Sequence, residues 1–89
     1  MYIKLEQYKI FNEAATTLSF SIAARNLFIS QSAVSQTISS IEKELQTQLF
    51  IRHSKGVSLT KEGKLLHQQI DKALAIITGV ENQISNFHE

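Results

Sequence analysis

The chain contains no cysteine, no proline and no tryptophan, and only three of its 89 residues are glycine. Without cysteine it can form neither a disulfide bond nor a thiolate metal site. No apolar run approaches the roughly 18 residues that a membrane-spanning helix requires. The sequence also has no glycine-rich phosphate loop and no plausible pair of nucleophile and base. We therefore expect a protein without a membrane segment, without a cofactor and without enzymatic activity.

The remaining candidates for chemistry are weak. His53, His67 and His88 do not have the spacing of metal ligands, so we expect no metal site. Glu42 and Glu44 are two residues apart and would point to different sides of a helix, which is a poor arrangement for paired acid and base catalysis.

The N-terminal segment carries Lys4, Glu6, Lys9 and Glu13, where a signal peptide would need an uninterrupted apolar core. The lack of cysteine is compatible with a reducing compartment. We therefore expect a cytoplasmic protein, and the length suits a single small core.

The net charge of +1 says little about possible partners, but the charged residues are unevenly distributed along the chain. No acidic residue occurs from position 14 to position 41, and the segment 45–61 contains Arg52, Lys55 and Lys61 without an acid. A weakly basic segment beside an uncharged polar one is a possible phosphate-facing surface, although charged runs are more often simply solvated.

Apolar residues at helical spacing predict three helices in the first half of the chain. The first ends near residues 16–19, the second is short with Ser21 as its expected cap, and the third begins after Ser30 and runs to about Glu44. The stripe of the first helix is Leu5, Tyr8, Phe11, Ala15 and Leu18. Only about two residues separate the second and third helices, so the two should cross steeply, as in a helix-turn-helix.

The turn of this helix-turn-helix is unusual in its residue type. Ala24 supplies the small side chain needed where the two helices touch. Phe28 stands in the turn, where many such units have glycine. A bulky residue there implies either a different turn geometry or strain.

The third predicted helix has an uncharged, hydrogen-bonding side. Val34, Ile38 and Ile41 form its apolar stripe, and Ser30, which precedes the helix, is also a candidate DNA-binding residue. The opposite side holds Gln31, Ser32, Ser35, Gln36 and Ser39. Glutamine can bond bidentately to adenine, and serine can donate or accept at almost any base edge. Any one of these residues is more simply a solvated side chain, but the set predicts that residues 31–44 read the major groove of double-stranded DNA.

The helical spacing of apolar residues ends after residue 45. Two β-prone runs, residues 49–52 and 57–59, flank Gly56, which can adopt the positive φ of a tight turn. This predicts a β-hairpin. Thr60 is the expected cap of a last helix that continues to about Phe87. Such a helix would be roughly 40 Å long, so much of it must project or pack on a partner.

The last helix carries an apolar seam at alternating spacings of four and three, which is typical of a coiled coil. Its members are Leu66, Ile70, Ala73, Ile77, Val80, Ile84 and Phe87. Leu65, Leu74 and Ile76 widen the stripe, which leaves open a helix folded back on its own domain. We favour a homodimer that contacts its own domain with the first half and a partner with the second. Two copies would suit a two-fold symmetric operator.

An ordered combination of short motifs runs along the chain: Ala23-Ala24, Ser30-Gln31, Ala33-Val34-Ser35, Ile41-Glu42, Leu49-Phe50, Arg52, Val57, Leu59-Thr60 and Gly63. Over essentially the whole chain, this combination resembles the LysR-type bacterial transcription regulators. The resemblance implies a mainly α fold, a winged helix-turn-helix of three helices and a two-stranded wing in residues 1–60. A linker helix in residues 61–89 would pair two subunits.

The resemblance also implies roles for single residues. Those matching Gln31, Ser32, Ser35 and Gln36 face the major groove, and Arg52, in a wing at 50–59, contacts the DNA backbone or minor groove. Lys55 is expected to help position the same wing.

Three departures from the family pattern stand out: Ser32 replaces a common proline, Gln36 a common arginine, and Gln46 a common glycine. Without the arginine, a strong guanine reader is lost, so the base preference should differ. Family members continue into a larger effector-binding domain. We therefore expect an N-terminal fragment or an unusually short member, with a small-molecule effector only if that domain exists.

Two alternatives remain open at this point. The chain could be a helical protein-interaction module that uses residues 61–88, or a winged-helix regulator of another family.

Overall fold

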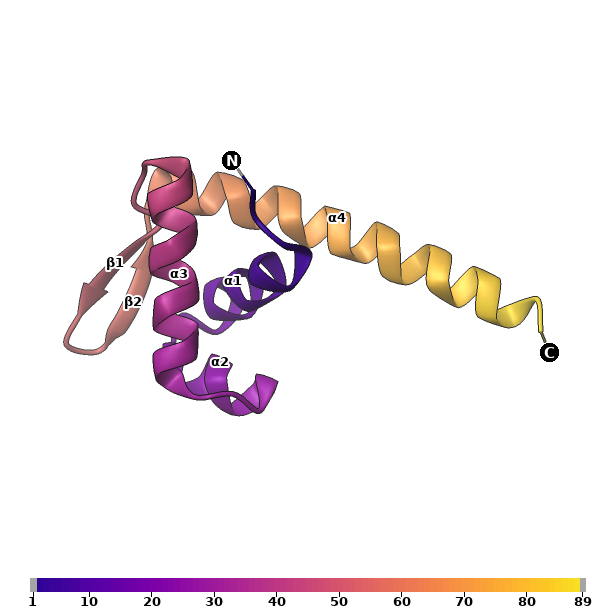
Figure 1. The fold of residues 1–89 in the computed structure, drawn as a ribbon, viewed down its shortest axis with the longest axis horizontal. Coiled ribbons are helices and arrows are strands. Elements are labelled where there is room, and N and C mark those ends of the chain that lie inside the picture. The colour runs from indigo at the N-terminus through magenta and orange to yellow at the C-terminus, as the bar shows by residue number, and fades with distance from the viewer. Residues whose placement is uncertain (1, 89) are drawn as a thin grey trace.

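The computed structural model describes residues 2–88. Its elements are α1 (Leu5–Thr17), α2 (Phe20–Leu27), α3 (Gln31–Leu45), β1 (Phe50–His53), β2 (Gly56–Leu59) and α4 (Lys61–Asn86). Three helices and the hairpin gather at one end of the molecule, and α4 extends away from them (Figure 1), within overall dimensions of 49 × 27 × 20 Å. The predicted mainly α, winged helix-turn-helix fold with a long last helix is confirmed. The predicted division into residues 1–60 and 61–89 stays a prediction, and its outer limits, residues 1 and 89, lie outside the described residues.

The core lies where α1, α2 and α3 meet the hairpin. Phe50 of β1 is its centre: its ring lies 5.6 Å from that of Phe11 and 5.3 Å, edge-on, from that of Phe20. Such aromatic pairs stabilise a core beyond the area that they bury. The other buried apolar residues are Ala14, Ala15, Ala23, Ala24, Val34, Ile38, Ile41, Leu49 and Val57. No helix among residues 2–88 is long and apolar enough to span a bilayer.

The first predicted helix is confirmed as α1, but two residues of its apolar stripe are not buried. Leu5 and Leu18 remain 47% and 43% exposed, whereas Ala14 is fully buried. Leu5 is the first residue of the helix. Leu18 is its C-cap and has left-handed backbone angles, which end the helical periodicity before its side chain.

Two of the three predicted helix caps are confirmed. The hydroxyl of Ser30 accepts a hydrogen bond from the Ala33 amide, and that of Thr60 accepts one from the Gly63 amide, as expected. Ser21 is not the cap of α2. That helix begins at Phe20, whose side chain is buried in the core, and the hydroxyl of Ser19 caps it by accepting from the Ile22 amide.

Three helices end on a non-glycine residue with a left-handed backbone: Leu18 (φ 54°), Phe28 (φ 58°) and Gln46 (φ 54°). The turn between α2 and α3 has three residues, 28–30, one more than predicted. Of the two alternatives expected at Phe28, a different turn geometry or strain, its left-handed φ indicates strain, and Gln46 ends α3 in the conformation that glycine usually adopts.

The wing is an antiparallel pair in which Phe50 faces Leu59 and His53 faces Gly56. Gly56 has φ 137°, in agreement with the predicted turn. A carboxylate oxygen of Glu42 in α3 accepts hydrogen bonds from the backbone amides of Leu49 (2.7 Å) and Phe50 (3.2 Å). Glu42, considered above as a possible catalytic residue, therefore holds the start of β1 against α3.

Candidate nucleic-acid interface

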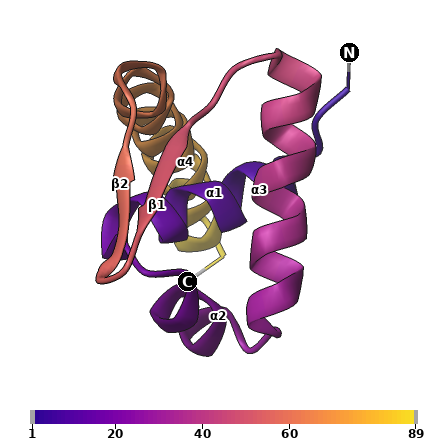
Figure 2. The same cartoon turned by 90° about the vertical axis from the view of Figure 1, so that its left-hand side faces the viewer.

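α3 and the wing lie at the same end of the molecule (Figure 2), and a hydrogen bond between Arg52 and Ser35 joins them. Val34, Ile38 and Ile41 are fully buried, so the opposite side of α3 must face outward. Of the predicted contact residues, Gln31, Ser32, Gln36 and Ser39 are exposed, and Ser35 is half-buried. The helix thus presents hydroxyls and amides on a rigid support, and it has no acidic residue before Glu42.

Ser30 is exposed, but its hydroxyl already has two neighbours. It accepts from the Ala33 amide at 3.0 Å, and it lies 3.2 Å from the hydroxyl of Ser32. Its main local effect is to cap the start of α3, where the other amides of the first turn have no partner within the helix.

Arg52 links the wing to α3. Its Nη2 donates to the Ser35 hydroxyl at 2.9 Å, and its guanidinium carbon lies 4.8 Å from the centre of the Phe20 ring. The second contact has the geometry of a cation–π interaction. Neither contact was predicted, because Ser35 is 17 positions away in sequence and only the fold brings the two together.

A hollow of about 280 Å³ lies between the wing and the N-terminal ends of α2 and α3. Its lining includes Ser19, Gln31, Arg52 and His53, and no carboxylate among residues 2–88 contributes to it. Lys55 is exposed in the two-residue turn of the hairpin. The face therefore combines hydrogen-bonding groups with cations, as a surface for a polyanion requires.

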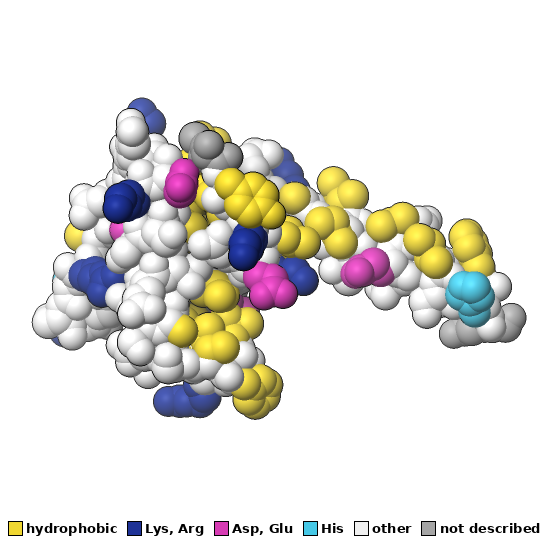
Figure 3. Space-filling view, in the orientation of Figure 1, with side chains coloured by type: hydrophobic (Ala, Val, Ile, Leu, Met, Phe, Trp, Pro, Cys, Tyr) yellow, Lys and Arg dark blue, Asp and Glu magenta, His cyan; other side chains and the backbone are white. Residues whose placement is uncertain are grey.

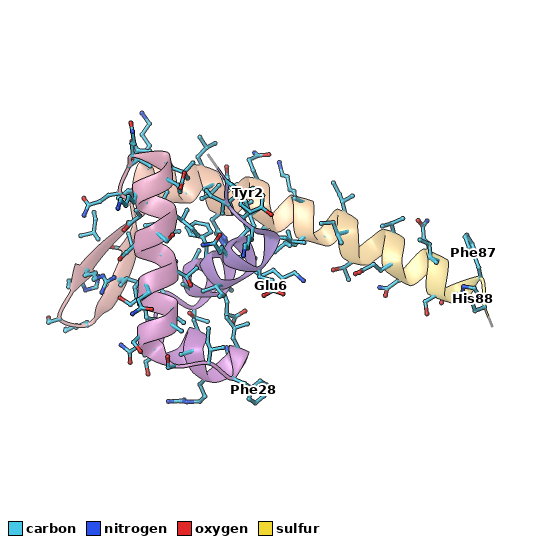
Figure 4. The ribbon with its side chains drawn as sticks, viewed as in Figure 1. Tyr2, Glu6, Phe28, Phe87 and His88 are labelled. Carbon is cyan, nitrogen blue, oxygen red and sulfur yellow. The ribbon has the colours of Figure 1, made fainter. Side chains whose placement is uncertain are left out.

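The C-terminal helix forms a second surface. Leu66 packs against the core and Ile70 is half-buried, whereas Ile77, Val80, Ile84 and Phe87 are 37%, 47%, 51% and 80% exposed. Ala73 is also exposed. A row of hydrophobic side chains follows the projecting part of α4 (Figure 3), and Phe87 lies at its far end (Figure 4). The predicted seam thus divides into a first part against its own domain and a free second part.

Polar contacts fix the direction in which α4 leaves the domain. The Asn12 side chain in α1 contacts Nδ1 of His67 through its oxygen at 2.8 Å and donates through its nitrogen to Asp71 at 3.2 Å. Gly63 allows α4 to lie close to the residue before β1, because a Cβ at position 63 would collide with the carbonyl oxygen of Leu49. No group of three or more possible metal ligands occurs among residues 2–88.

Comparisons with known proteins agree with this geometry. Residues 5–64 match the family described as bacterial regulatory helix-turn-helix protein, lysR family. An uncharacterized HTH-type transcriptional regulator of Methanocaldococcus jannaschii is 38% identical over 97% of this chain and 29% of its own length. The HTH-type transcriptional activator AmpR of Citrobacter freundii is 46% identical over 73% of this chain and 22% of its own length.

The solved structures include a crystal structure of the BenM DBD in complex with catB site 1 DNA. It superposes with a TM-score of 0.90 at 29% sequence identity and covers 98% of this chain and 97% of that one. The chain spans less than a third of the length of the two regulators named above. The match over residues 5–64, together with the relative that is similar over nearly all of this chain, shows that the protein belongs to the lysR family of bacterial regulatory helix-turn-helix proteins.

Proposed function

We propose that this chain is the DNA-binding and dimerisation part of a transcriptional regulator, with α3 in the major groove and the wing on the backbone or minor groove. The observation that carries the proposal is the two-sided character of α3. One side is fully buried, and the other is an uncharged hydrogen-bonding surface beside a hairpin that holds Arg52 and Lys55. A recognition helix needs this arrangement, because a rigid support must bring short polar side chains to base edges.

The residues have different roles in this proposal. Gln31 and Gln36 suit adenine, to which an amide can bond bidentately, and Ser32 and Ser39 suit several base edges. Ser30 contributes by starting α3, whose first amides would contact phosphate. Lys55 and the free donors of the Arg52 guanidinium would position the wing on the backbone without reading sequence.

A homodimer through α4 would complete the function. The free part of the seam, from Ala73 to Phe87, is long enough for about four helical turns of paired contacts. With few cations per subunit, one domain would bind weakly, and two linked domains would gain affinity from a two-fold symmetric operator. We accordingly assign residues 1–60 to DNA binding and residues 61–89 to dimerisation.

The wider biological role follows from the relatives. They are described as transcriptional regulators, which supports a non-enzymatic, cytoplasmic protein. The chain spans less than a third of their length, and a small-molecule effector would bind only if a further, C-terminal domain exists.

The proposal can be tested with duplexes selected from a random library. We expect the chain to select a short sequence and to bind it less tightly as the salt concentration rises, because phosphate contacts release counterions. Gln36→Ala should change the selected sequence. The matched control is Gln68→Ala, at an exposed glutamine of α4. If the wild type selects no sequence, or if the two variants behave alike, α3 is not the reading helix.

A further inference from the structure

Arg52 has less freedom than a wing residue that only meets phosphate. Its hydrogen bond to the Ser35 hydroxyl and its position over the Phe20 ring hold the guanidinium from two sides. Phe20 is itself fixed, since it is 6% exposed and packs edge-on against Phe50. The guanidinium is therefore placed against α3 before any ligand arrives.

This contact determines what Ser35 can do. A serine hydroxyl has one proton to donate and two lone pairs that accept. Arg52 occupies one lone pair, and its donated N–H excludes the Ser35 proton from that side of the oxygen. A cationic donor also polarises the hydroxyl, which strengthens it as a donor and weakens it as an acceptor.

We propose that Arg52 is a positioning residue for base readout: it makes Ser35 a hydrogen-bond donor, so that Ser35 selects a base edge that accepts. The inference rests on the proposed function of α3. Guanine O6 and N7, adenine N7 and thymine O4 are such edges in the major groove, whereas cytosine offers only its amino donor there. Ser35 should therefore discriminate against cytosine at the base that it contacts.

This role differs from the one that the family resemblance gives to Arg52. A residue that contacts only the DNA backbone weakens all duplexes alike when it is removed. A residue that acts through Ser35 also changes the base preference at one position and leaves the preference at the other positions intact.

The test uses the duplex that the wild-type chain selects. The base pair read by Ser35 is the one whose preference is lost in Ser35→Ala. At that position, the four possible base pairs are compared for the wild type, Arg52→Ala, Arg52→Lys and the double variant Ser35→Ala/Arg52→Ala. Lys55→Ala is the matched control, because it removes an exposed cation from the same hairpin. Far-UV circular dichroism checks that each variant is folded.

We expect the wild type to prefer accepting edges over cytosine by about tenfold at this position, as a single hydrogen bond to a base allows. Arg52→Ala should reduce this preference several-fold, and the double variant should show no further loss compared with Ser35→Ala. Arg52→Lys should restore part of it, because lysine donates a hydrogen bond but lacks the planar fork. Lys55→Ala should weaken all duplexes alike and leave the preference unchanged.

The inference is overturned if Arg52→Ala keeps the wild-type preference at the Ser35 position, or if the two single effects on that preference simply add. In either case the wild type still selects a sequence, so the proposed function survives. A wild type that selects no sequence refutes the proposed function and the inference with it.

Discussion

The carboxylate of Glu42 gives a direct test of how the wing is attached. It accepts hydrogen bonds from the backbone amides of Leu49 and Phe50, two residues that are 1% and 2% exposed. In Glu42→Ala both amides lose their acceptor. A hydrogen bond to a charged group contributes about 1.5–3 kcal/mol, and a buried donor left without a partner costs about 1–3 kcal/mol.

Glu42 itself is half-exposed, so water can reach part of the vacated space. We therefore expect Glu42→Ala to lower the free energy of unfolding by about 3 kcal/mol, less than the full cost of two orphaned amides. Glu42→Gln keeps an acceptor oxygen without the charge and should cost about 1 kcal/mol. A loss of 3 kcal/mol is a large part of the roughly 5–15 kcal/mol that a small domain has.

The assay is urea unfolding followed by far-UV circular dichroism, because the chain has no tryptophan for fluorescence. Protein concentration must be held constant, since the proposed dimer would contribute to apparent stability. Glu44→Ala, an exposed glutamate in the same helix, is the control and should stay within about 0.5 kcal/mol of the wild type. If Glu42→Ala is no less stable than Glu44→Ala, the carboxylate does not anchor the wing.

Three further predictions follow from the backbone and from the last helix. Phe28→Gly should raise the free energy of unfolding by about 0.5 kcal/mol, because it relieves a left-handed residue that is 94% exposed, and a loss of stability by urea titration would contradict this. Gly63→Ala should cost about 2–3 kcal/mol, since its Cβ would collide with a backbone carbonyl. A Cβ at Gly79 would meet nothing within 4 Å, so Gly79→Ala should raise the free energy of unfolding by about 1 kcal/mol. A similar effect of the two substitutions on stability would refute the packing of α4. Ile77→Glu should raise the dimer dissociation constant at least about tenfold in sedimentation equilibrium. The control Ala75→Glu, also on α4, should leave it unchanged. An intact dimer in both variants would show that the apolar seam is not the dimer interface.

Local patterns account for most of what could be predicted from the sequence. The caps Ser30 and Thr60 and the turn at Gly56 each depend on residues close in sequence. The cap of α2 was misplaced because Ser19 and Ser21 are equally good caps by residue type. What decides between them is the burial of Phe20, which is a property of the assembled core.

The long-range contacts had no sequence signal. The Asn12–His67 contact joins residues 55 positions apart, and the Arg52–Ser35 bond depends on how the wing folds beside α3. The left-handed backbone at Leu18 also had no signal in the sequence, whereas at Phe28 and Gln46 the departure from a common glycine gave one. The predicted reading residues lie together because they share one helix, whereas their chemistry depends on neighbours that only the fold supplies.

The central claim is that α3 reads DNA sequence. The most direct measurement is the ratio of affinities for the selected duplex and for a scrambled duplex of the same length and composition, at physiological salt. We expect the selected duplex to bind about a thousandfold more tightly, the lower end of what specific DNA-binding proteins reach. Equal affinities for the two duplexes would contradict the account, because the charge of the surface alone would then explain all binding.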